Sequence, residues 1–265
     1  MECQYSAKGV LLISSTYDII FLLYNKGRIF MKQKLRIPAA VLYAASFLTL
    51  VLYLYIELNP MMMIFPTERL FLLAIICVSA YFGSLLFSKT VTENRSNIIM
   101  KATFCVFFGL YILLLVSLVL FDSYFGRVGF SLFSHWDKDT LAFQLENSLN
   151  IIPFKTISNI FTGFFVTSKL GAREFAVNII GNLIAFSPFA LFLPLLFKKV
   201  KAFKVFLIIM IGIVFTVEVL QFFLITGHCD IDDIILNVGG ACVLFWVLHL
   251  RPIKKLISKI TMLSY

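Results

Sequence analysis

Charged residues are scarce in this sequence. Asp, Glu, Lys and Arg make up only 14% of its 265 residues, whereas 60% are hydrophobic. A soluble protein of this length needs a polar exterior, and long stretches of the chain offer no residues to build one. The composition therefore excludes an ordinary soluble protein and predicts one whose solvent is the lipid bilayer.

Signals for disulfides, cofactors and metals are also missing. Of the five cysteines only Cys229 lies in a predicted external loop, so no disulfide framework is expected. No nucleotide-binding loop, HExxH, GxSxG or metal-binding cysteine pair is present. The acidic stretch from Asp230 to Asn237 lacks the glycine and the glutamate of an EF-hand loop. We expect no cofactor and no metal, and a looser cation site built from Glu218 and the aspartates stays an open alternative.

Six apolar runs are long enough to cross a membrane, at ~20 residues for a spanning helix. They extend approximately over Ile37–Leu58, Leu70–Phe87, Ile98–Phe121, Phe175–Phe197, Val205–Ile225 and Ile234–Leu250. A shorter run from Val10 to Tyr24 carries Asp18 and predicts an interfacial helix or a seventh span, of which we favour the interfacial helix. The predicted fold is an all-α, polytopic integral membrane protein with about six transmembrane helices.

The distribution of basic residues predicts the orientation. With alternate loops on opposite sides, 17 of the 23 Lys and Arg residues fall on one side and six on the other. Basic loops favour the cytoplasm, so we predict a multi-pass protein of the cell membrane with both termini in the cytoplasm. The net charge of +9 lies in short clusters between apolar runs. The expected partner is therefore the lipid bilayer and not nucleic acid.

Polar side chains gather near the predicted outer ends of three spans. They are Glu174, Asn178 and Asn182 at i, i+4 and i+8, then Glu218 and Gln221, and finally Asp230, Asp232, Asp233 and Asn237. At ~1.5 Å per residue, Asn182, Glu218 and Asn237 each lie roughly 6 to 12 Å below the outer end of their helix. Polar residues in spans usually face the interior of the bundle, so these residues predict one outward-facing polar pocket. Residues 149–165, in the loop before these spans, predict an amphipathic or re-entrant segment.

Structural roles are the alternative for most of these residues. The amides can hydrogen-bond neighbouring helices, and Asp232 or Asp233 can cap the last helix. Gly239, Gly240 and Ala241 predict a close-packing surface. Glu218 fits a structural role least well, because a carboxyl group in apolar sequence needs a partner or a proton.

Four motifs, taken in order, resemble those of a known family. They are Asn150-Ile-Ile-Pro-Phe154, Asn178-Ile-Ile-Gly-Asn-Leu-Ile-Ala-Phe-Ser-Pro-Phe189, Glu218-Val-Leu-Gln221 and Asp230-Ile-Asp-Asp-Ile-Ile-Leu-Asn-Val-Gly-Gly240. Together they resemble the VanZ-like family. Ala190 and His228 depart from its pattern, at positions where glycine and arginine are common. The resemblance implies an N-terminal membrane unit at residues 1–97, a VanZ-like membrane domain at 98–250 and a basic cytoplasmic tail at 251–265.

The resemblance also implies a cell-envelope protein of Gram-positive bacteria, in a family named for resistance to teicoplanin. Our leading hypothesis is a non-enzymatic protein whose outward pocket binds a lipid-linked cell-wall precursor or an envelope glycopolymer and so lowers susceptibility to glycopeptides. The candidate binding residues are Asn150, Pro153, Phe154, Asn178, Asn182, Glu218, Gln221, Asp232, Asp233 and Asn237. Two alternatives stay open: an intramembrane enzyme that uses Glu218 or Asp233 on an envelope lipid, and a small transporter.

Overall fold

The computed structural model describes residues 7–59, 65–121 and 138–265. Helices form most of it, and its two strands, β1 (Leu149–Asn150) and β2 (Cys229–Asp230), have two residues each. Within these ranges six helical runs are long and apolar enough to cross a membrane: Lys32–Glu57, Thr67–Ser88, Glu93–Leu120, Ala172–Leu196, Phe203–Phe223 and Ile231–His249. The prediction of an all-α polytopic membrane fold with six spans is confirmed.

The chain divides into two compact units, Met1–Thr103 and Phe104–Tyr265. Unit 1 holds α1 (Ala7–Leu58), α2 (Pro66–Ser88) and the start of α3 (Glu93–Val116). Buried hydroxyl groups link its helices, since Ser84 Oγ lies 2.9 Å from Tyr43 Oη and 2.6 Å from Thr103 Oγ1. The domain boundary predicted after residue 97 rests on family resemblance and stays a prediction.

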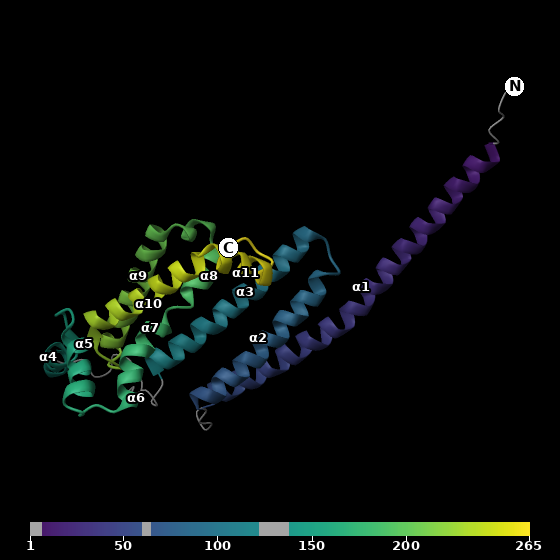
Figure 1. Ribbon diagram of the computed structural model, residues 1–265. Coiled ribbons are helices and arrows are strands. Elements are labelled where there is room, and N and C mark those ends of the chain that lie inside the picture. Colours follow the sequence, from purple (N-terminus) through teal and green to yellow (C-terminus); the bar gives the residue numbers. More distant parts are fainter. Residues whose placement is uncertain (1–6, 60–64, 122–137) are drawn as a thin grey trace. The chain divides into compact units, whose positions relative to one another are not determined.

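The predicted interfacial helix takes a different form. Residues 10–24 are helical, but they are the first part of α1, which runs without a break for 52 residues into the first span (Figure 1). Between Tyr24 and Ile37 the sequence has no proline and one glycine. Nothing there ends a helix, because a single glycine costs only ~1 kcal/mol and the other residues tolerate helical geometry.

Unit 2 packs its spans around an apolar core. Its remaining elements are η1 (Ser117–Phe121), α4 (Lys138–Asn147), α5 (Lys155–Phe161), η3 (Thr162–Val166), α6 (Ala172–Phe175), η4 (Ala176–Gly181), α7 (Asn182–Ala185), α8 (Phe189–Leu196), η5 (Lys198–Lys201), α9 (Phe203–Phe223), α10 (Ile231–His249) and α11 (Arg251–Thr261). Phe186, Phe189, Met210 and Phe245 belong to its buried core. The Tyr111 hydroxyl donates to the Ala185 carbonyl oxygen at 2.5 Å and joins α3 to α7.

The fourth span is irregular. It consists of α6, the π-helical η4, α7 and α8, with a turn at residues 186–188 between the last two. Pro188 has no N–H to continue the helix, and the Ser187 hydroxyl instead donates to the Leu183 carbonyl oxygen at 2.6 Å. Pro188 and this hydrogen bond account for the break between α7 and α8.

The close approach of α10 to α7 depends on one glycine. A Cβ atom built on the buried Gly240 would lie 1.9 Å from the carbonyl oxygen of Leu183 and 2.7 Å from its carbonyl carbon. These are backbone atoms of α7, which cannot rotate away as a side chain could. The neighbouring Gly239 has open space, with nothing within 4 Å of such a Cβ.

We therefore predict opposite effects of alanine at these adjacent positions. Gly240→Ala must push α10 away from α7 and should destabilise the protein by about 1–3 kcal/mol, the usual cost of overpacking. Gly239→Ala should be neutral or stabilising by up to about 1 kcal/mol, because alanine favours the helix. Thermal unfolding of both variants in detergent checks this. Equal melting temperatures would contradict the close packing of Gly240 on Leu183.

Candidate functional site

The candidate site is built on two aspartates at the start of α10. Asp230 is the N-cap residue of α10 and its Oδ1 accepts a hydrogen bond from the Asp232 N–H at 2.8 Å. The same oxygen accepts from Asn150 Nδ2 at 2.9 Å, and Oδ2 accepts from the Thr156 hydroxyl at 2.5 Å. Asp230 therefore joins the start of α10 to residues 150–156, some eighty positions earlier in the chain.

Asp232 caps a second helix. Its side chain is fully buried, with 0% exposed. Its Oδ1 accepts from the Phe154 N–H at 2.5 Å, and its Oδ2 accepts from the Ile157 N–H at 3.0 Å. Phe154 is the N-cap residue of α5 and has a left-handed backbone with φ 65°. The carboxylate thus lies at the positive end of α5, where the helix dipole favours negative charge.

These contacts fix the segment Asn150–Phe154, which we name the anchored loop. Asn150 pairs with Asp230 in the parallel β1–β2 bridge, and its side-chain oxygen accepts from the Ile152 N–H at 3.2 Å. The polar groups of the loop face the aspartates, whereas Ile151, Ile152 and Phe154 leave 74%, 57% and 62% of their surface exposed. The anchored loop therefore has a polar side that is hydrogen-bonded to the aspartates and an exposed apolar side, which we call its apolar tip.

Glu218 and Gln221 lie on α9, beneath the start of α10. Glu218 is 3% exposed, and its Oε2 accepts from the Asp230 N–H at 3.3 Å. Gln221 is 4% exposed, and its Nε2 donates to the Val119 carbonyl oxygen of η1 at 3.1 Å. Glu218 thus belongs to the aspartate cluster, whereas the hydrogen bond from Gln221 to Val119 joins two spans.

A second group surrounds Asp233. The Asn182 side-chain amide of α7 donates to Asp233 Oδ1, and Asn237 Nδ2 donates to the Asp233 carbonyl oxygen at 2.8 Å. Asn237 is 3% exposed, and its Oδ1 has no hydrogen-bond partner among the residues that the structure describes. This oxygen is a spare acceptor close to the start of α10.

Asn178 lies apart from this group. It is exposed, and its side-chain amide donates to the Glu174 carbonyl oxygen of its own helix at 2.8 Å. The sequence predicts one face for Asn178 and Asn182 on the assumption of a regular α-helix. The π-helical η4 covers Ala176–Gly181, and its wider turn changes the angle between the two side chains.

The structure thus joins four of the ten predicted site residues in one network and places the others outside it. Asn150, Phe154, Asp232 and Glu218 connect through Asp230. Pro153 is exposed in the anchored loop, and Asn178 lies outside the network. The sequence places Asp230 in the predicted polar pocket, but the candidate binding residues include neither Asp230 nor Thr156. A capping aspartate ahead of the last span could have identified Asp230, but no sequence signal connects Thr156 to it.

The network compensates its charges with hydrogen bonds. Asp230 and Asp232 make no ion pair within the described residues, and N–H and O–H donors engage their oxygens instead. No group of three or more His, Cys, Asp or Glu residues that could hold a metal ion occurs in this part of the chain. The arrangement is suited to holding two helix ends and a loop in fixed positions.

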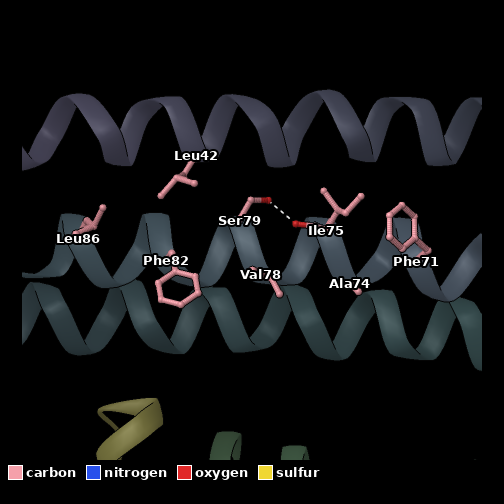
Figure 2. Close-up of a pocket in the computed structure, with 8 residues that line it drawn as sticks. All are labelled: Leu42, Phe71, Ala74, Ile75, Val78, Ser79, Phe82 and Leu86. Atoms are coloured by element: carbon pink, nitrogen blue, oxygen red, sulfur yellow. Dashed lines mark hydrogen bonds between the residues drawn. The ribbon is translucent and has the colours of Figure 1, made fainter.

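An apolar groove lies in unit 1 (Figure 2). It has a volume of about 570 Å³ and is lined by Leu42 of α1 and by Phe71, Ala74, Ile75, Val78, Ser79, Phe82 and Leu86 of α2. The one hydroxyl group among these side chains, that of Ser79, donates to the Ile75 carbonyl oxygen at 2.6 Å. Nothing in this lining binds a polar group, so it is no match for the predicted polar pocket.

Taken together, the spans and the buried polar network define a polytopic α-helical membrane protein with exposed apolar surfaces that contact lipid. The family model described as VanZ/LLP1 matches residues 108–252, which is more than half of the chain. The chain therefore belongs to the VanZ/LLP1 family, and the predicted resemblance is confirmed. Comparison with curated proteins and with solved structures gives no significant match.

The hydrogen bonds of Asp232 generate a prediction for Asp232→Asn. In an amide an NH2 group replaces one of the two carboxylate oxygens, and it cannot accept from the Phe154 or Ile157 N–H group that faces it. A hydrogen bond to a charged group contributes ~1.5–3 kcal/mol, and we expect amide exchange in residues 154–157 to become roughly 10- to 100-fold faster. Hydrogen–deuterium exchange with mass spectrometry measures this. The exposed Glu146→Gln is the charge-matched control, and unchanged exchange in Asp232→Asn would contradict the contact.

Cys229 provides a pH-dependent prediction. Burial raises the pKa of its thiol, and the negative charges of Glu218 and Asp230 raise it further. A raised pKa leaves less thiolate at neutral pH, so alkylation should be slow at pH 7 and reach its half-maximal rate at a higher pH than a free cysteine. Glu218→Gln removes one of these charges and should move the midpoint to lower pH. Iodoacetamide kinetics in a variant whose other four cysteines are replaced would check this, with N-acetylcysteine as the reference.

Proposed function

We propose that this chain is a non-enzymatic protein of the cell envelope that binds a lipid-linked cell-wall precursor or an envelope glycopolymer at its anchored loop. The observation that carries the proposal is the loop's construction, with an apolar tip on a hydrogen-bonded polar base. A rigid loop binds with a smaller entropic cost than one that must become ordered. The wild-type chain would thereby reduce the access of teicoplanin to its target, as the family resemblance implies.

The surface around the loop suits an amphiphilic ligand. Ile151, Ile152 and Phe154 offer exposed apolar contacts for a lipid tail. Lys155, which follows them, is exposed and offers a positive charge for a phosphate group. A lipid-linked precursor combines the tail and the phosphate in one molecule.

The hydrogen bonds of Asp230 and Asp232 favour a binding role for these two carboxylates over a catalytic one. A general acid or base must exchange a proton with its substrate, but both Asp232 oxygens accept from backbone N–H groups and both Asp230 oxygens accept from protein donors. The excess of basic residues in the loops on the opposite side supports an outward orientation of the anchored loop in the cell membrane, with both termini cytoplasmic.

The test compares two matched pairs of variants in a Gram-positive host. Asn182→Ala removes a contact to α10, whereas Asn178→Ala removes one to its own helix. Ile151→Ser and Val166→Ser replace side chains that are 74% and 75% exposed, but only Ile151 lies in the anchored loop. We expect wild type to raise the teicoplanin concentration that inhibits growth, Asn178→Ala and Val166→Ser to retain this effect, and Asn182→Ala and Ile151→Ser to lose it at equal membrane levels.

Other outcomes would redirect the assignment. An unchanged teicoplanin response in cells that express wild type would reject the resistance function. A new envelope-lipid product, lost in Glu218→Gln, would replace binding with catalysis. Ligand flux into vesicles that contain the purified chain would indicate a transporter.

A further inference from the structure

The other end of unit 2 carries an amphipathic helix with an uncovered apolar side. Helix α11 begins two residues after the last span ends at His249. Ile253, Leu256, Ile257 and Ile260 repeat at i, i+3, i+4 and i+7, which places them on one face of the helix. Leu256 and Ile260 are 55% and 47% exposed. The protein therefore leaves part of this apolar face uncovered, at a level next to the membrane boundary.

Contacts to the residues after α11 fix the rotation of the helix. The Tyr265 hydroxyl donates to the Ala190 carbonyl oxygen at 2.6 Å, and the Tyr265 N–H donates to Ser258 Oγ at 3.2 Å. Lys201 Nζ of η5 donates to the Ser264 carbonyl oxygen at 2.7 Å. With the Ser258 side turned toward the protein, the exposed apolar residues Leu256 and Ile260 face away from it.

Basic residues flank this apolar side and make no ion pair within the described part of the chain. The exposed basic residues of α11 are Arg251, Lys255 and Lys259. Three more exposed lysines lie in η5 and at the start of α9: Lys198, Lys199 and Lys204. No Asp or Glu occurs in residues 175–217 or 234–265. Burial lowers the pKa of Lys201, and the charges of Lys254 and Lys198 lower it further. This end of the unit is therefore a crowded cationic surface.

We propose that α11 and η5 form a binding surface for the headgroups of anionic phospholipids, with α11 lying in the plane of the membrane interface. Leu256 and Ile260 enter the acyl boundary, and Arg251, Lys255 and Lys259 meet lipid phosphates. Interfacial helices combine an apolar face with basic residues in this way, and each basic residue near an anionic surface adds to the attraction.

Orientation of the chain alone does not explain these features. The tendency of basic loops to stay in the cytoplasm requires only charge near the ends of the spans. It requires neither a regular apolar face nor hydrogen bonds from Tyr265 and Lys201 that set the rotation of α11. An apolar face with flanking positive charge matches the two parts of an anionic phospholipid.

The test uses fluorescence quenching of Trp246, which lies on α10 close to α11 and is 59% exposed. The full chain with Trp136→Phe is reconstituted in phosphatidylcholine vesicles that contain brominated phosphatidylglycerol or brominated phosphatidylcholine. We expect wild type to favour phosphatidylglycerol by about fivefold or more at low salt, since each basic residue near the surface contributes to the affinity. The triple variant Arg251→Gln, Lys255→Gln, Lys259→Gln should bring this ratio close to one.

A charge-matched control separates a local surface from net charge. Arg36→Gln, Lys89→Gln, Lys101→Gln also removes one Arg and two Lys, all exposed and all in unit 1, and should retain the wild-type ratio. Leu256→Ser with Ile260→Ser should lower the ratio as well, and melting temperatures confirm that each variant is folded. Equal ratios in both triple variants, or no preference in wild type, would overturn the proposal. These readouts do not depend on glycopeptide susceptibility, so they test α11 separately from the anchored loop.

Discussion

The burial of Asp232 is the constraint on which the candidate site depends. A carboxylate with no exposed surface is costly unless protein donors replace its water. Here the donors are the Phe154 and Ile157 N–H groups at the start of α5. Because those groups are 78 and 75 positions away in the sequence, satisfying one side chain fixes the position of the helix that precedes the fourth span.

The exposure of the apolar side chains of the anchored loop follows from these hydrogen bonds and those of Asp230. Asn150 and Thr156 turn their polar groups toward Asp230, and the backbone at Phe154 turns toward Asp232. The side chains of Ile151 and Ile152 are then left on the opposite side of the loop. In water an exposed apolar cluster of this kind favours aggregation, but at a membrane boundary it can contact lipid. The polar and the apolar residues of the motif therefore have complementary roles.

Hydropathy predicts the spans well but the site only in part. A run of ~20 apolar residues has few alternatives to a membrane helix, and all six predicted spans have counterparts in the structure. The relation between Asn178 and Asn182 was harder to predict, because it depends on a π-helical segment that residue spacing does not reveal. The hydrogen bond from Thr156 to Asp230 depends on tertiary packing. Local patterns give neither feature.

The two ends of unit 2 compensate charge in different ways. At the start of α10, hydrogen-bond donors within the protein engage the acidic oxygens of Asp230 and Asp232. At α11 and η5 most of the basic residues are exposed, and no Asp or Glu occurs in residues 175–217 or 234–265. Exposed like charges repel one another unless counter-charge comes from outside. At the end of a membrane span the nearest fixed negative charges are lipid phosphates. The bilayer therefore supplies the counter-charge for the basic residues at this end, whereas hydrogen-bond donors of the protein engage the aspartates at the other.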